Sequence, residues 1–360
     1  MRSHRSIIDQ HSEVNCMNAR ERVTAAMEYR AVDQAPLQYY YSPVGYYEHG
    51  EKLNELFAAL PGDFAPFSRQ PIPVLGKERF DAGGRYHEYR TDEWGAVWEH
   101  RIFGVSGIVY RHPLADWAAL EHLQVPALPA PTGPAFEAEK ARLKKHQETF
   151  FALVGCGSLL ERMSALRGDA ALYCDLAEDS PEIHRLADLI AGYDRALVER
   201  AVALGADAVA FGDDYGTERS LLMSPAMWRA FFKPRLRYIF EPAVRAGVKI
   251  HFHSCGLISD IIEDLREVGA TSLWPQLPAY DMRELAGRCR ALGLAVAIHT
   301  DRANTMTFGT PKQVCELVRR EYETFRMWEG GSWFYVEPDN GFPFENIAAL
   351  VQTIAEWRSA

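Results

Sequence analysis

The pattern of apolar and polar residues changes about one third of the way along the chain. From about residue 136 onward, short apolar runs rich in β-branched and aromatic residues alternate with longer segments whose apolar residues recur with helical spacing. Short strands that are apolar throughout are typical of a parallel sheet buried on both faces. The predicted strands are 150–155, 208–211, 248–252, 272–275, 295–299 and 333–337, and the predicted helices include 181–204, 225–246, 258–268, 282–292, 311–328 and 345–358. This alternation predicts an α/β fold.

The N-terminal third is less regular. A helix is predicted at 18–29, where Asn18 can cap the first turn and Glu21 completes a capping box. A strand at 35–41 follows, and residues 42–135 are rich in aromatic residues, Gly and Pro. Within them we expect a short hairpin near 86–109 and excursions over the mouth of a barrel.

The strand at 35–41 brings the number of clear strands to seven, and we expect an eighth in the irregular N-terminal third. The predicted fold is therefore a (β/α)8 TIM barrel with an irregular N-terminal extension that covers the barrel mouth. An open doubly wound sheet is the alternative, which the lack of a glycine-rich phosphate fingerprint makes less favoured. We expect residues 1–17 to form a polar lead-in and residues 18–360 to form one domain.

Composition narrows the class of protein. The 360 residues are 48% hydrophobic and 24% charged, as in ordinary globular proteins. No apolar run approaches the roughly 20 residues of a membrane span, and the N-terminus lacks the apolar core of a secretory signal. A net charge of -10 argues against nucleic-acid binding. Six scattered cysteines without a CxxC pair favour a reducing cytoplasm.

The segment VKIHFHSCG at 248–256 carries the most informative chemistry. Alternate residues of a strand share one face, so His251, His253 and Cys255 point the same way. An imidazole and a thiolate two residues apart can bind zinc at the C-terminal end of a strand, where barrel enzymes place their active sites. The plainer interpretation is a small buried Cys beside a core His, and we expect His251, which lies deeper, to be a packing residue.

Polar residues also follow the other predicted strands. Of the adjacent Asp213 and Asp214, one is expected to face the pocket and orient a substrate or a metal-binding His, while helix capping is the alternative role. Gln276 follows the strand at 272–275 and is a candidate substrate-binding residue. Catalytic zinc sites use three protein ligands, and Glu337 is the expected third ligand, with Asp339 as the alternative carboxylate.

The remaining candidates have competing structural roles. Arg302 could bind a carboxylate or phosphate of a ligand, or form a salt bridge with Glu337 or Asp301. His299 is a candidate catalytic residue for which packing within its strand is the favoured interpretation. The candidate residues for lining a substrate pocket are Tyr39, Tyr41, Trp94, Asp213 and Tyr215. For any one of Tyr39, Tyr41 and Trp94, core packing is the favoured interpretation.

Taken together, these motifs resemble the uroporphyrinogen decarboxylase and cobalamin-dependent methyltransferase superfamily. The matching stretches are 18–23 (NARERV) with 33–36 (DQAP), 92–95 (DEWG), 112–117 (HPLADW), 211–216 (FGDDYG) with Ser224-Pro225 and Trp228, 233–235 (KPR), 253–256 (HSCG), 308–311 (FGTP) and 343–347 (PFENI). The resemblance implies a (β/α)8 barrel.

At two places the chain differs from the motifs of the superfamily, and these differences help to decide to which branch it is more similar. The decarboxylase branch has an arginine-rich signature beside its first strand, whereas this chain has LQYYYSP at 37–43. The methyltransferase branch has a zinc motif of His, one spacer, Cys and a distant second Cys. His253 and Cys255 match its first half, but Glu337-Pro338-Asp339-Asn340 stands where the second Cys is expected. Replacing a thiolate by a carboxylate makes the bound metal a harder Lewis acid, which suits an oxygen-bearing substrate.

The resemblance thus implies a zinc-dependent methyltransferase of the O-demethylase type. It would pass a methyl group from a small methoxylated, aromatic compound to the cobalt of a separate corrinoid protein, with zinc on His253, Cys255 and Glu337 and the substrate held by Asp214 and Arg302. One alternative is a metal-free decarboxylase of a smaller carboxylate, which Arg302 would bind with Arg85 or Arg101. Another is a non-catalytic corrinoid- or tetrapyrrole-binding barrel. A folate as the methyl acceptor and a homodimer as the assembly also stay open.

Overall fold

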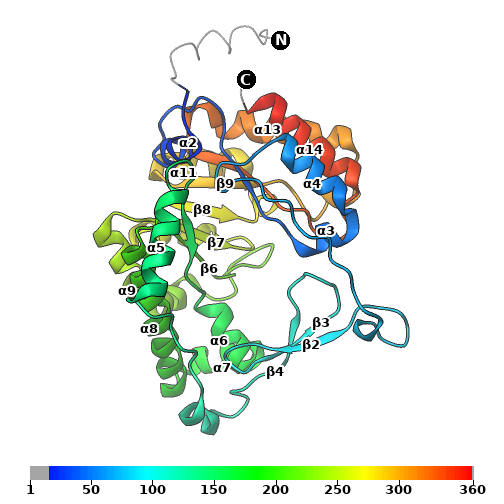
Figure 1. The fold of residues 1–360 in the computed structure, drawn as a ribbon. Coiled ribbons are helices and arrows are strands. Elements are labelled where there is room, and N and C mark those ends of the chain that lie inside the picture. The colour runs from blue at the N-terminus through cyan, green and yellow to red at the C-terminus, as the bar shows by residue number, and fades with distance from the viewer. Residues whose placement is uncertain (1–15, 359–360) are drawn as a thin grey trace.

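A curled, seven-stranded parallel sheet organises the molecule (Figure 1). The computed structural model describes residues 16–358. Along the sheet the strand order is β1-β10-β9-β8-β7-β6-β5. The strands are β1 (Leu37–Tyr39), β5 (Leu153–Gly155), β6 (Ala208–Gly212), β7 (Lys249–Ser254), β8 (Ser272–Pro275), β9 (Ala295–His299) and β10 (Ser332–Val336). The predicted α/β alternation is confirmed in all seven places, with boundaries shifted by up to three residues at either end.

Helices follow the strands as the apolar periodicity predicts. They are α2 (Ala19–Met27), α3 (Pro43–His49), α4 (Glu51–Ala59), α5 (Pro134–His146), α6 (Leu160–Arg167), α7 (Asp169–Glu178), α8 (Pro181–Leu204), α9 (Pro225–Ala246), α10 (Ile262–Glu267), α11 (Met282–Leu292), α12 (Thr305–Phe308), α13 (Pro311–Phe325) and α14 (Phe344–Trp357). The predictions for α8, α9 and α11 are correct at both ends. For α8 and α9 the cause is visible in the sequence: a capping Ser and a Pro begin each helix, and a left-handed Gly ends it.

Alternate residues of the strands divide the core in two. One face of the sheet packs against the helices through residues such as Val209, Phe252 and Ile298. The other face forms a smaller cluster that contains Ala208, Ala295, Ala297, Trp333 and Tyr335, with Phe151, Val23 and Met27. His251 is buried beside this cluster, with its ring 5.2 Å from that of Trp333. It is a core residue, as expected.

The expected eighth strand is absent from the described residues. The edge strands β1 and β5 are instead linked through one residue: the Asp63 N–H donates to the Leu37 carbonyl (2.7 Å), and the Phe151 N–H donates to the Asp63 carbonyl (3.4 Å). Pro61 and Pro66 flank this segment. Because proline has no N–H to donate and fixes its own φ, the segment between them cannot extend into a regular strand.

The N-terminal third contributes a second sheet, in which the hairpin predicted near 86–109 is present as β2 and β3 and is extended by a third strand. Its antiparallel strands β2 (Glu88–Thr91), β3 (Val97–His100) and β4 (Ile108–Arg111) lie in the order β2-β3-β4 near α6 and α7 (Figure 1). Asp92 fixes the β2–β3 turn, because its carboxylate accepts hydrogen bonds from the backbone of Trp94 and Ala96 and from the Trp98 indole. Its ion pair with Arg162 (2.9 Å) ties the sheet to α6.

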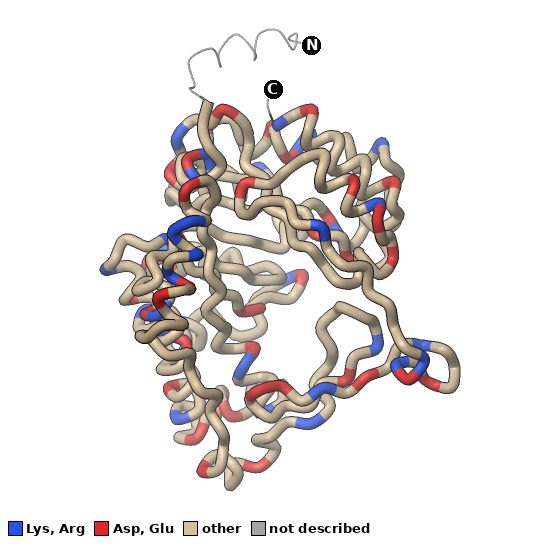
Figure 2. Tube along the Cα trace, viewed as in Figure 1, with Lys and Arg blue, Asp and Glu red and all other residues tan. Residues whose placement is uncertain are grey.

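Acidic and basic residues are interspersed over the trace (Figure 2). Neighbouring outer helices are joined by ion pairs, such as Arg195 with Glu241 (2.7 Å) and Arg235 with Asp188 (2.8 Å). Within residues 16–358, no helix is both long and apolar enough to span a membrane.

Candidate active site

The carboxyl ends of β6 and β7 meet closely. The two strands pair in parallel, with Gly212 opposite His253. The loops that leave them touch at two glycines: a Cβ on Gly256 would lie 2.1 Å from the Gly216 carbonyl carbon, and Gly256 has a φ of +74°. Only glycine permits both this contact and this conformation. The loop after β6 is thereby held against the HSCG segment.

Three side chains with metal-binding atoms converge at this junction: Asp214, His253 and Cys255. One ligand atom from each lies within 4.8 Å of the other two. The His253 Nε2 is 3.4 Å from the Asp214 Oδ1 and 3.5 Å from the Cys255 Sγ. A carboxylate, an imidazole and a thiol in one cluster, all half-buried, are a donor set that suits zinc and leaves a fourth position for substrate.

The hydrogen bonds and charges around this cluster favour the binding of a cation. The His253 Nδ1 lies 2.9 Å from the Trp274 carbonyl, which fixes the ring and leaves Nε2 free toward the cluster. Burial and the neighbouring Asp214 carboxylate raise the pKa of the Cys255 thiol to about 12. Burial opposes ionisation of Asp214 as well, but contacts with His253 and the Cys255 N–H hold its pKa below the usual value. A cation would relieve the repulsion between thiolate and carboxylate.

Asp213 has a structural role next to this cluster. It is fully buried, and its carboxylate accepts hydrogen bonds from the backbone N–H groups of Leu159 and Glu161 and from the Tyr215 hydroxyl. Burial raises its pKa to about 6. Asp213 thus holds the first turn of α6 against β6. Capping of the next helix, one of the roles considered for the aspartate pair, is seen at Asp213, while Asp214 is the member of the pair that contacts His253.

Glu161, on that first turn, is a carboxyl group that was not singled out in the sequence. The residue reaches solvent, yet burial of its carboxyl and the charges of Asp213 and Asp214 raise its pKa to about 8. Glu161 precedes Arg162, which anchors the antiparallel sheet. Nothing in this local sequence indicated that the pKa of the Glu161 carboxyl would be raised.

A small cavity of about 80 Å³ adjoins the cluster. It is lined by His253, Cys255, Trp274, Pro275, Gln276, Leu277, Pro278, His299, Arg302 and Ala303. Three residues predicted from strand ends, Gln276, His299 and Arg302, thus lie together beside His253 and Cys255. Trp274 was not singled out in the sequence, although its ring is 4.1 Å from that of His253. A tryptophan within an apolar strand has no local feature that distinguishes a pocket wall from the core.

Glu337 lies outside the three-residue cluster. Its carboxylate accepts a hydrogen bond from the Tyr335 hydroxyl (3.3 Å), and burial together with the Asp339 charge raises its pKa. Asp339 lies 3.6 Å from Arg302 and is its ion-pair partner. The partner expected from the sequence was Glu337 or Asp301. Asp301 instead accepts hydrogen bonds from the N–H groups at the start of α12.

The aromatic residues predicted to line a substrate pocket pack in the core. Tyr39 and Tyr41 pack on Phe57, with ring centroids 4.4 and 6.0 Å away. Trp94 is buried against Tyr193, with ring centroids 5.1 Å apart. Tyr215 is fully buried and donates to Asp213. None of these four lines the cavity beside Cys255.

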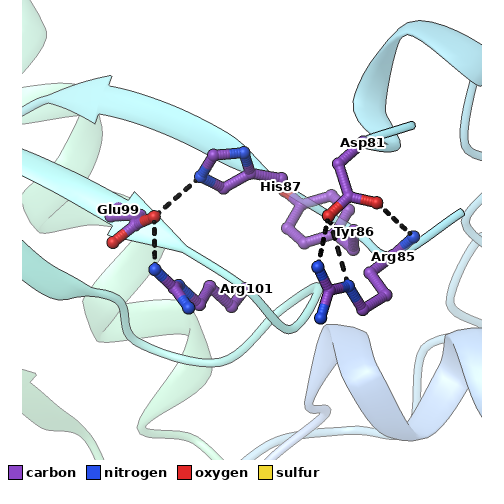
Figure 3. A pocket seen from close by; sticks show the side chains of 6 residues that line it. All are labelled: Asp81, Arg85, Tyr86, His87, Glu99 and Arg101. Atoms are coloured by element: carbon purple, nitrogen blue, oxygen red, sulfur yellow. Dashed lines mark hydrogen bonds and ion pairs between the residues drawn. The ribbon is translucent and has the colours of Figure 1, made fainter. Parts of the chain in front are cut away.

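A second hollow lies in the antiparallel sheet (Figure 3). Its charged groups are paired among themselves: Glu99 contacts His87 (2.8 Å) and Arg101 (3.0 Å), and Asp81 contacts Arg85 (3.2 Å). Arg85 and Arg101, considered as carboxylate-binding partners of Arg302, therefore line a different cavity and are neutralised there.

Comparison with known proteins agrees with this architecture. The sequence profile of the uroporphyrinogen decarboxylase (URO-D) family matches residues 103–357. Among solved structures, a methyltransferase from Methanosarcina mazei is similar over 95% of this chain and 99% of its own, with 18% identity and a TM-score of 0.65. A B12-independent methionine synthase from Shewanella sp. W3-18-1 covers 77% of this chain and 74% of its own, with 13% identity and a TM-score of 0.42. No curated protein matches the sequence. At 18% identity, the first of these structures shows a shared fold.

Proposed function

Because the chain belongs to the uroporphyrinogen decarboxylase family, as its motifs indicated, we propose that it is a methyltransferase of the zinc-dependent, O-demethylase type. It would take the methyl group of a methoxylated compound and pass it to the cobalt of a corrinoid carried by a partner protein. The observation that carries this proposal is the cluster of Asp214, His253 and Cys255. The metal-free decarboxylase of the alternative would need no such set of metal-binding groups.

The metal ligands in this proposal are Asp214, His253 and Cys255. The third ligand thus comes from the loop after β6, the strand next to β7, rather than from Glu337. Zinc bound there would act as a Lewis acid on the ether oxygen and stabilise the negative charge that develops as the methyl group leaves.

The remaining roles belong to side chains of this chain. Trp274 fixes the His253 ring through its carbonyl, and the Cys255 N–H fixes the Asp214 carboxylate (2.7 Å). Preorganisation of this kind limits the reorganisation needed during the reaction.

Metal content is the test. Elemental mass spectrometry of protein purified without chelator should find about one zinc ion per chain, as expected for a single three-ligand site. Cys255→Ala and Asp214→Asn should lose it, while Glu337→Gln and the control Cys174→Ala, an exposed cysteine on α7, should keep it. Methyl transfer from a methoxyarene to a corrinoid protein should follow the zinc content.

Two results would overturn the proposal. A wild-type protein without metal that decarboxylates a small carboxylate would support the decarboxylase alternative. Full zinc content with no methyl transfer from any methoxylated compound, in the presence of a corrinoid protein, would remove the proposed reaction. If Glu337→Gln instead of Asp214→Asn loses zinc, the ligand set assigned here is wrong.

A further inference from the structure

The cavity beside Cys255 has an unusual distribution of charge for this chain. The whole protein has a net charge of -10, and acidic residues are spread over its trace (Figure 2). Yet none of the ten residues lining this cavity is Asp or Glu, and one, Arg302, is a cation. Arg302 is therefore the cation with which a negatively charged ligand group could pair, in competition with Asp339.

The polar groups in the cavity wall are available as hydrogen-bond donors. The Gln276 side-chain oxygen accepts from the Gly256 N–H (2.8 Å), so its amide nitrogen remains without a partner among the described residues. Within residues 16–358, the buried His299 Nε2 also has no hydrogen-bond partner. Arg302 is half-exposed, and its contact with Asp339, at 3.6 Å, is longer than a hydrogen bond. Buried polar atoms without partners in a pocket wall are suited to bind a ligand.

Resting on the proposed function, we propose that Arg302, Gln276 and His299 bind a carboxylate group of the methyl donor. One guanidinium and two neutral donors match the single charge of a carboxylate better than the double charge of a phosphate. Burial and the charge of Arg302 lower the pKa of His299 to about 3, so this imidazole adds no second positive charge.

The size of the cavity limits what enters it. About 80 Å³ is room for several water molecules, which suits a carboxylate group. Since His253 and Cys255 line the same cavity, the carboxylate and the methoxy group of a donor must lie close to one another. The preferred substrates are therefore compact methoxy acids, with the two groups on neighbouring atoms rather than at opposite ends of a ring.

Equilibrium binding tests this subsite without requiring turnover. The affinity of the zinc-loaded protein is measured by calorimetry for methoxyacetate, 2-methoxybenzoate and 4-methoxybenzoate, each paired with its neutral amide. We expect each acid to bind about tenfold or more tightly than its amide, since one charge-assisted hydrogen bond is worth at least that ratio. The two compact acids should show the largest ratios.

Variants distinguish the contribution of Arg302 to carboxylate binding from the general effect of removing an arginine. Arg302→Gln should bring the acid-to-amide ratio close to one, and Arg302→Lys should restore part of it. The control Arg101→Gln removes an arginine from the other hollow (Figure 3) and should leave the ratio unchanged. Asp339→Asn removes the competing carboxylate and should leave acid binding equal or tighter.

The outcomes of this test and of the methyl-transfer test are distinguishable. Equal affinity for acid and amide, or a ratio unaffected by Arg302→Gln, overturns the carboxylate subsite even if methyl transfer occurs. A preference for 4-methoxyphenyl phosphate over the acids also overturns it. An acid-to-amide ratio that depends on Arg302 supports the subsite, and if methyl transfer is absent at the same time, only the proposed reaction fails.

Discussion

Asp213 and Asp214 show how far adjacent residues can differ in role. Successive side chains after a strand point in opposite directions, so Asp213 enters the core and caps α6 while Asp214 reaches His253. Substituting Asp213 should therefore cost stability, whereas substituting Asp214 should cost metal binding. The residue type alone contains no such distinction.

Another buried carboxyl, Glu321 on α13, allows a prediction about pH. One of its oxygens accepts a hydrogen bond from the Thr300 hydroxyl (2.8 Å), the other has no partner, and burial raises the pKa to about 8. The folded state thus keeps a proton that the unfolded state releases above pH 4.5. Stability should fall as pH rises from about 4.5 to 8, by up to about 1.4 kcal/mol per pH unit.

Glu321→Gln should remove this dependence. The variant should gain in melting temperature relative to wild type at pH 8.5 and gain much less at pH 5, as measured by differential scanning calorimetry. Glu316→Gln, an exposed position on the same helix, is the control. An equal effect of Glu321→Gln at both pH values would show that Glu321 is ionised in the folded protein.

Among the elements, the contact between the loops after β6 and β7 decides whether the cluster forms. Gly216 and Gly256 bring the two backbones together, and Asp214 and Cys255 lie next to them. The metal-binding cluster is thus a property of two paired strands rather than of one motif.

Gly256→Ala should separate these loops. The new methyl group would lie 2.1 Å from the backbone of Gly216 at a φ of +74°, and the backbone conformation alone costs about 1–2 kcal/mol. We expect reduced stability in chemical denaturation and reduced zinc content. Gly287→Ala is the matched control: it lies in α11 with open space around its Cβ position, where alanine should be neutral or stabilise by about 0.5–1 kcal/mol. Normal zinc binding by Gly256→Ala would show that the close contact is dispensable.

At the scale of the whole molecule, a buried ionic network joins α2 and the residue after α14 to the seam of the sheet, the place where Asp63 links β1 to the residues before β5. Asp63 pairs with Arg22 of α2 and with Arg358 after α14 (2.6 Å), and Arg22 also pairs with Asp33 (2.7 Å). The same Asp63 links β1 to the residues before β5 through its backbone. The motif stretches at 18–23 and 33–36 thus serve the seam rather than the active site.

Asp63→Ala should therefore be strongly destabilising. Arg358 is 3% exposed, and Asp63 is its charged partner, so the variant leaves a buried cation at a cost of about 3–5 kcal/mol. Urea denaturation measures this cost. Glu241→Ala, which breaks a half-exposed pair with Arg195, should cost less than about 1 kcal/mol. Similar losses for both variants would contradict the role assigned to the network.

The sequence by itself determined the strands after residue 136 and six of the helices between and after them, the family, and the pairing of His253 with Cys255. Each depends on local chemistry: apolar periodicity, capping residues, and the alternation of side chains along one strand. The N-terminal third could not be predicted as well, because its prolines interrupt regular structure and its second sheet is held by contacts with α6.

Tertiary structure alone decided the rest of the site. The third residue of the cluster is Asp214 because β6 is the hydrogen-bonded neighbour of β7, whereas β8 and β9 separate β7 from β10 and Glu337. An aromatic side chain by itself does not distinguish Trp274 from Tyr39, Tyr41 and Trp94. Of these four residues, only Trp274 lies on a strand beside His253. Which strand ends meet depends on sheet order and on the packing of the helices, and these are set by contacts between residues far apart in the sequence.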